Sequence, residues 1–159
     1  MTVTPLSYEE RLNSGFTHKL VLPYTDFTGL TSGTAVSLFP ALNAATTIAA
    51  GVSISRCAIN VSTAFTFAAG TLVAVIGDGG DDDRYLTSTS LKTAGYTETP
   101  AATKPYTYGS ADTVDIKITC GAGTPATIAA GELTVFLRRP AESCASASAF
   151  GPITTPTTR

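Results

Sequence analysis

Apolar and polar residues alternate with a period of two along several short segments of the chain. In Val114–Cys120 every second residue is apolar, and the residues between are Asp, Lys and Thr. This period places one row of side chains in a core and the other row in water, as in a half-buried β-strand. Glu132–Leu137 alternates in the same way, with Leu133, Val135 and Leu137 on one face. Both segments therefore predict strands that pack one face on a shared core.

Shorter apolar runs bounded by proline or glycine predict further strands. Lys19–Leu22 ends at Pro23, and Ala35–Phe39 ends at Pro40. Thr71–Ile76 is almost continuously apolar, which is typical of a strand covered on both faces.

The segment Val52–Val61 changes phase along its length. Val52 and Ile54 share one face, whereas Cys57, Ile59 and Val61 have the opposite parity. We therefore expect a β-bulge or a corner near Ser55 and Arg56.

Seven or eight such strands with turns between them predict an all-β fold, an antiparallel β-sandwich or jelly roll. One short helix is expected, because Ser7-Tyr8-Glu9-Glu10 fits a capping box and the helix would end at 13–15, although a mobile arm is the alternative. We divide the chain into an N-terminal arm (1–16), a β-sandwich domain (17–139) and an extended C-terminal tail (140–159). The tail is rich in Ser, Thr, Ala and Pro, with Phe150 and Ile153 as its large apolar residues. Plain disorder is the interpretation that we favour for it, and an arm that orders only against a neighbouring subunit is the functional alternative.

Charged residues are scarce, at 14% of the 159 residues against about 25% in typical soluble domains. The formal net charge of −2 favours association over mutual repulsion, although a soluble monomer with a Thr-rich surface has the same composition. The ten Lys and Arg residues form no basic stripe, so we expect no nucleic-acid partner. The longest weakly polar run, 41–52, is too short to span a membrane, and we expect no membrane partner.

The residues that enzymes use most often are few and scattered. His18 is the only histidine, it precedes the first strand of the sandwich, and we expect it on the surface. G-x-S-x-G and P-loop motifs are absent, so we expect no enzyme and no cofactor. Cys57, Cys120 and Cys144 form no metal-binding pattern, and an odd number of cysteines fits synthesis in a reducing cytoplasm. We expect Cys57 and Cys120 in the core and Cys144 exposed in the tail.

The segment Gly77–Leu86 carries four carboxylates that we read as a glycine-rich loop. A calcium ion is one hypothesis for them, because Ca²⁺ takes six to eight oxygen ligands, but the spacing matches no EF-hand. The alternative, which we favour, is a hydrated loop in which Arg84 neutralises one of the acids. The calcium candidates are Asp78, Asp81, Asp82 and Asp83.

Four tyrosines lie in and after this segment. Their rings could stack on sugars, fill a core or anchor a protein interface, and we favour the interface. With the aromatic residue of the tail, the predicted interface residues are Tyr85, Tyr96, Tyr106, Tyr108 and Phe150.

Several short motifs, in this order, resemble a group of small virion proteins of tailed bacteriophages. They are Asn60–Phe65, Gly77–Leu86, Leu91–Tyr96, Ala111–Ile116 and Gly131–Val135, so the resemblance covers roughly residues 53–138. It implies a β-sandwich on the virion, in many cases a capsid decoration (cement) protein of the head, and it brings no catalytic residues. It also favours a homo-oligomer, often a trimer, that binds the major capsid protein at the capsid surface. The alternative is a receptor- or glycan-binding β-sandwich head of a fibre or tail.

Overall fold

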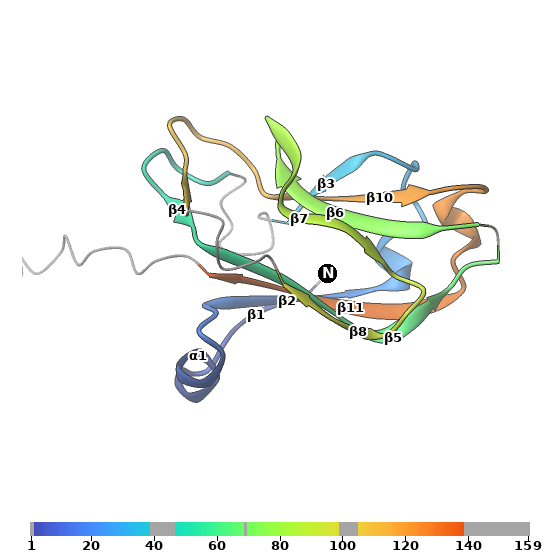
Figure 1. The fold of residues 1–159 in the computed structure, drawn as a ribbon, viewed down its shortest axis with the longest axis horizontal. Helices are drawn as coiled ribbons and strands as arrows, with labels where there is room; N and C mark the ends of the chain where they lie inside the picture. Colours follow the sequence, from blue (N-terminus) through green and yellow to red (C-terminus); the bar gives the residue numbers. More distant parts are fainter. Residues whose placement is uncertain (1, 39–46, 69, 99–104, 139–159) are drawn as a thin grey trace, which may run out of the picture.

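Two antiparallel β-sheets face each other across a hydrophobic core in the computed structural model of the chain (Figure 1). The structure describes residues 2–38, 47–68, 70–98 and 105–138. Within them, one sheet has the strand order β1-β2-β11-β5-β8 and the other has the order β3-β10-β6-β7. A two-stranded ribbon, β4-β9, lies at one end of the sandwich. The predicted all-β antiparallel sandwich is confirmed.

Most of the elements are short. The five-stranded sheet consists of β1 (Thr2–Pro5), β2 (His18–Pro23), β11 (Ala130–Arg138), β5 (Arg56–Thr66) and β8 (Gly95–Glu98). The four-stranded sheet consists of β3 (Ala35–Ser37), β10 (Asp115–Cys120), β6 (Leu72–Asp78) and β7 (Asp81–Ser90). The ribbon consists of β4 (Ser53–Ile54) and β9 (Tyr106–Thr107). The helical elements are α1 (Tyr8–Ser14) and the 3₁₀ turns η1 (Tyr24–Asp26) and η2 (Pro125–Thr127).

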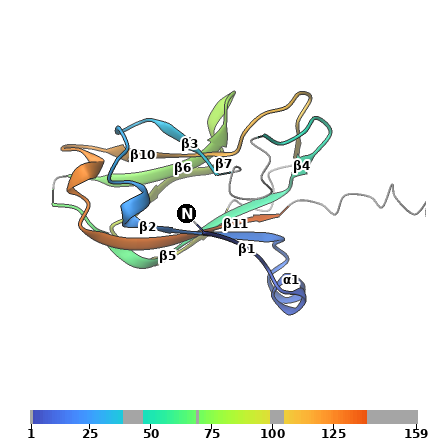
Figure 2. The same ribbon diagram turned by 180° about the vertical axis from the view of Figure 1, so that it is seen from behind.

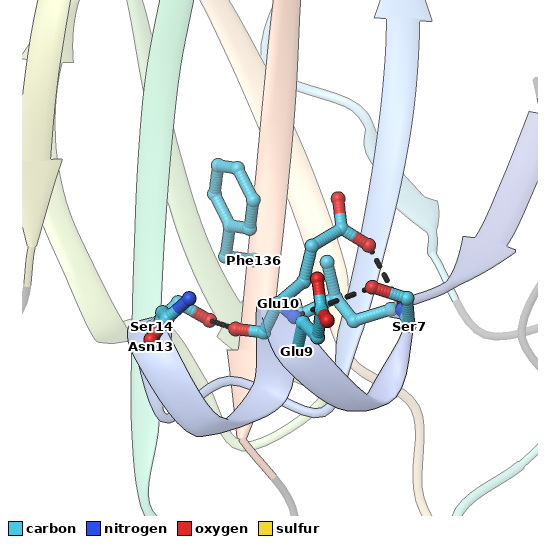
Figure 3. Close-up of a pocket in the computed structure, with 7 residues that line it drawn as sticks. Ser7, Glu9, Glu10, Asn13, Ser14 and Phe136 are labelled. Carbon is cyan, nitrogen blue, oxygen red and sulfur yellow. Dashed lines mark hydrogen bonds between the residues drawn. The ribbon is translucent and has the colours of Figure 1, made fainter.

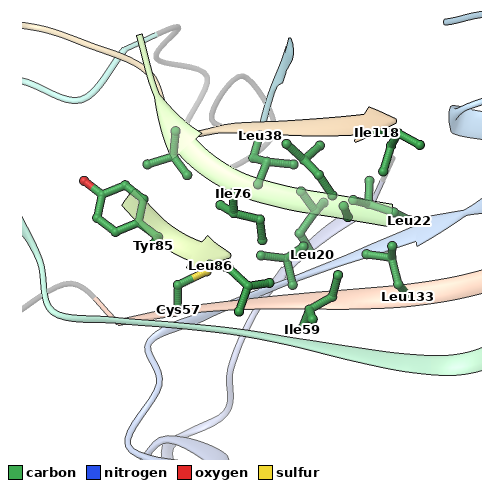
Figure 4. Packing of buried hydrophobic residues seen from close by; sticks show 14 of the residues in the cluster. Leu20, Leu22, Leu38, Cys57, Ile59, Ile76, Tyr85, Leu86, Ile118 and Leu133 are labelled. Carbon is green, nitrogen blue, oxygen red and sulfur yellow. The ribbon is translucent and has the colours of Figure 1, made fainter. Parts of the chain in front are cut away.

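The alternating segments contribute one apolar row each to the core, as predicted. Ile116 and Ile118 of β10 are buried, and so are Leu133 and Val135 of β11. Figure 4 shows Ile118 and Leu133 between the two layers, with Cys57 in the same cluster. The two sheets thus bury the apolar face of each strand against the other sheet.

The described residues contain eleven strands, more than the seven or eight expected. The strands not foreseen are β1, β7, β8 and β9, because part of β7 was expected as a loop. The chain crosses repeatedly between the two sheets, and the jelly roll stays a prediction.

The expected corner at Ser55 is present. Ile54 pairs with β9 in the ribbon, whereas Arg56 begins β5 and pairs with β11. The continuous apolar run in β6 is less covered than its sequence predicted, since Val73 and Val75 are only half-buried. Their side chains point to the outer face of the four-stranded sheet, because alternate residues of β6 fill the core.

The N-terminal helix forms where the capping box predicts it. The Ser7 backbone N–H donates to Glu10 Oε2 (2.8 Å), and the Glu10 N–H donates to Ser7 Oγ (3.2 Å). The reciprocal bonds satisfy two backbone donors at the start of α1. Viewed from behind, α1 lies outside the five-stranded sheet (Figure 2).

Residues 2–16 are nevertheless not an arm separate from the sandwich, and here the structure corrects our domain boundaries. β1 pairs in antiparallel register with β2 of the same chain, from Thr2↔Val21 to Pro5↔His18. Leu6 and Phe16 then pack with Ala58 and Phe136 in a second small apolar cluster on the outer face of the sheet. The segment therefore extends the sheet and covers part of its outer face. The predicted tail, 140–159, lies outside the described residues.

Candidate functional site

The acidic segment forms a hairpin. β6 ends at Asp78, Gly79 and Gly80 make the turn, and β7 begins at Asp81, which pairs with Asp78. A Cβ at Gly77 would overlap the backbone of Asp81 and Asp82, so this close approach requires glycine. The expected loop is thus reduced to a two-residue turn, and all four aspartates lie on strands, Asp78 at the end of β6 and the other three on β7.

Asp78 is the centre of this hairpin and is only 3% exposed. Its Oδ1 accepts hydrogen bonds from the backbone N–H groups of Gly80 and Asp81, both at 3.0 Å. Its Oδ2 accepts from Nε of Arg84 at 2.5 Å. The predicted neutralisation of one acid by Arg84 is present. A buried carboxylate with this many donors stabilises the turn that surrounds it.

The other acidic residues do not converge on a common point. Asp81 Oδ2 is 3.9 Å from Nη1 of Arg84, Asp82 pairs with Lys117 of β10, and the Asp83 side chain is exposed. Across the ranges that the structure describes, no group of three or more His, Cys, Asp and Glu side chains is placed to hold a metal ion. The calcium hypothesis has no geometric support at this hairpin.

Two of the predicted interface tyrosines lie in the core instead. Tyr85 and Tyr108 are 5% and 2% exposed, and the Tyr85 hydroxyl donates to the Tyr108 hydroxyl at 2.5 Å. Burial raises the pKa of both phenols above the usual value. Because each hydroxyl has a partner, the rings are core filler with satisfied polar ends, and neither can anchor a partner.

The other two predicted interface tyrosines, Tyr96 and Tyr106, are exposed, so the interface prediction stays open for them. Tyr106 stacks beneath the Arg84 guanidinium, with 3.9 Å from Cζ to the ring centroid, and meets Tyr108 edge-on at 5.1 Å. Tyr96 is 54% exposed and donates its hydroxyl to Glu98 Oε2 at 2.7 Å. Burial, followed by this carboxylate, raises the pKa of Tyr96 to about 12. Phe150 lies outside the described residues.

A groove runs between α1 and the outer face of the five-stranded sheet (Figure 3). Leu6 and Phe136 form its apolar floor, and the helix supplies a polar rim. The rim residues are Ser7, Glu9, Glu10, Asn13 and Ser14. The capping box indicated the helix, but no local pattern indicated the sheet face that it covers.

Polar contacts hold α1 at this place. Lys19 Nζ lies 2.9 Å from Glu10 Oε1, and Arg56 Nη1 donates to the Ser14 carbonyl at 3.2 Å. Arg56 also stacks on the Phe16 ring, 4.5 Å from its centroid, and pairs with Glu98. Sequence reasoning missed the Arg56–Glu98 pair, because 42 residues separate the partners.

The histidine and the two described cysteines are at least partly buried in the fold. His18 is half-buried rather than fully on the surface, and it shares a 2.8 Å hydrogen bond with the Thr17 hydroxyl through Nδ1. Cys57 is buried, which raises the pKa of its thiol, and Cys120 is half-buried. Cys144 lies outside the described residues. None of the helices in the described part of the chain is long and apolar enough to cross a membrane.

Comparisons with known proteins show a shared fold. No protein-family model and no curated protein matches the chain. A chain in the cyanophage Pam1 capsid asymmetric unit matches with a TM-score of 0.51 and 20% identity, over 76% of this chain and 80% of that chain. A chain in the capsid of Ralstonia phage GP4 matches with a TM-score of 0.48 and 14% identity, over 87% and 90%. At this level of identity, the first match establishes that the two chains share an architecture.

Proposed function

We propose that the chain is a structural protein of a bacteriophage virion, and specifically a capsid decoration (cement) protein that binds the major capsid protein. The observation that carries this proposal is the fold shared with a chain of the Pam1 capsid, over most of the length of both chains. Because many functions can occur on one fold, this likeness supports the role without establishing it. The motifs that resemble small phage virion proteins point in the same direction.

The surface chemistry supports a protein that works in contact with neighbours. Ten basic and twelve acidic residues in 159 leave few charges for the surface, and Thr, Ser, Ala and Gly take their place in the composition. Such a surface can be covered by another protein without stripping water from many charges. We propose a homo-oligomer, with a trimer favoured by the resemblance, that adds many small interfaces across the shell. Small interfaces are individually weak, and their combination makes binding strong.

The test is binding to shells that lack the protein. Purified protein should sediment with DNA-free, expanded heads, and electron microscopy should place its density on the capsid surface. Removal of residues 140–159 should weaken this binding while the sandwich stays folded. Removal of residues 2–16 is not an equivalent test, because β1 and α1 belong to the folded sheet.

The alternative is a glycan- or receptor-binding head of a fibre or tail. Two of the four tyrosines that suggested it are buried, so only Tyr96 and Tyr106 remain as stacking surfaces. Glycan binding that is lost in Tyr96→Ala or Tyr106→Ala, together with no binding to heads, would replace the proposed function with this one.

A further inference from the structure

The groove beneath α1 is an apolar surface that the described residues leave partly open. Leu6 is buried in its floor, but Phe136 is only half-buried although it belongs to the apolar cluster with Phe16. The two Phe rings are 5.6 Å apart and tilted, so one side of the Phe136 ring faces the groove. An aromatic side chain placed there would extend this cluster and bury further apolar surface.

The end of β11 brings the chain to this groove. Phe136 lines the groove, and β11 ends two residues later at Arg138. Arg138 pairs with Arg56, whose guanidinium in turn contacts the last residue of α1, Ser14. The last described residue, Arg138, therefore lies beside the groove, near the C-terminal end of the helix.

We propose that residues 143–158 of the same chain dock in this groove, with Phe150 as the side chain that covers Phe136. Phe150 is twelve positions after Arg138, and a chain of this length reaches about 40 Å when extended. This reach is long enough for the chain to turn back to Phe136, which lines the groove only two residues before Arg138. A tethered segment also has an effective concentration in the millimolar range, so even a weak contact is populated.

The charges of both surfaces fit this occupant. Residues 143–158 contain no charged side chain, and Phe150 is the only aromatic residue after Phe136. On the rim, the Glu10 carboxylate is already bound by Lys19 and by the Ser7 N–H. Docking therefore covers no unpaired charge at Glu10, and no charge of the tail has to be desolvated. The inference concerns the free chain and does not depend on the proposed virion role.

The native thiol of the tail allows a direct test. Cys57 is buried, and Cys120→Ser removes the half-buried thiol, so a nitroxide spin label can be attached at Cys144. Paramagnetic broadening of the backbone amide signals of α1 and of Phe136 is expected in the full-length labelled chain. Adding Phe150→Ala should reduce the broadening to the level of an undocked tail, which is not zero because Cys144 follows Arg138 by only six residues, about 20 Å of extended chain. Ile153→Ala is the matched control and should reduce the broadening much less.

A mixed sample identifies which tail occupies the groove. Isotope-labelled chains without nitroxide are combined with unlabelled chains that carry it, so broadening arises only between molecules. The proposal expects no broadening of α1 in this mixture. Broadening in the mixture as strong as in the single chain would assign the groove to a neighbouring copy and overturn the proposal. The absence of broadening in both samples, or broadening that Phe150→Ala leaves unchanged, would overturn it as well.

Discussion

Two arginines occupy equivalent settings at different places in the sandwich. Arg84 pairs with Asp78 and stacks on Tyr106, and Arg56 pairs with Glu98 and stacks on Phe16. The acids differ in burial, because the Asp78 side chain is 1% exposed and that of Glu98 is 24% exposed. An ion pair that water can reach loses little when it is broken, whereas a buried carboxylate left alone is costly. The arginine–carboxylate pair should therefore contribute much more to the free energy of unfolding at the hairpin than beside α1.

Removing Arg84 should have the largest effect. Arg84→Met keeps an apolar stem of similar length on Tyr106 but leaves the Asp78 carboxylate buried without its cation. We expect a loss of about 3 kcal/mol in the free energy of unfolding, measured by urea denaturation at neutral pH. Asp78→Asn in the Arg84→Met background should recover part of the loss, because the buried charge is then gone. A loss no larger than that of Arg56→Met would contradict the contrast between the two sites.

Arg56→Met should have a smaller and more local effect. Arg56 and Glu98 keep 31% and 24% of their side-chain surfaces exposed, so solvent screens the pair. We expect a loss of about 1 kcal/mol or less in the free energy of unfolding. The stack on Phe16 and the bond to the Ser14 carbonyl are lost too, so amide hydrogen exchange in α1 should become faster than elsewhere. Uniformly faster exchange over the whole sandwich would show that Arg56 supports the global fold instead.

The hairpin also shows what sequence patterns can and cannot reveal. The alternation in Val114–Cys120 predicts its buried face, because a strand's periodicity is a local property. The capping box predicts α1 for the same reason. The burial of Tyr108 depends on Tyr85, 23 residues away, and no local pattern separates a core tyrosine from an exposed one. Likewise, Asp78 resembles its three acidic neighbours in sequence, and only the turn at Gly79 and Gly80 encloses it.

The N-terminal segment was misjudged for a related reason. Thr2–Pro5 is too short to show a strand period, and its partner strand β2 is separated from it by the helix. Its pairing depends on Leu6 and Phe16 reaching Ala58 and Phe136, which come from two distant strands. Contacts of this kind follow from the tertiary fold. The sequence alone therefore predicted the helix but not the sheet face on which it packs.

The smallest expected effect concerns the other end of α1, where Glu10 bonds to Lys19 and Ser7. The Lys19 bond, followed by the Ser7 bonds, lowers the pKa of Glu10 from 4.5 to about 2. A carboxylate whose pKa is lowered by folding stabilises the native state above its unfolded pKa, and this contribution is lost as the pH falls. Hydrogen exchange and chemical shifts of α1 should therefore change between about pH 4.5 and about pH 2. In Glu10→Gln this titration should disappear, while Glu9→Gln should retain it, because Glu10 alone closes the capping box. A transition that persists in Glu10→Gln would assign the acid sensitivity of the helix to another carboxylate.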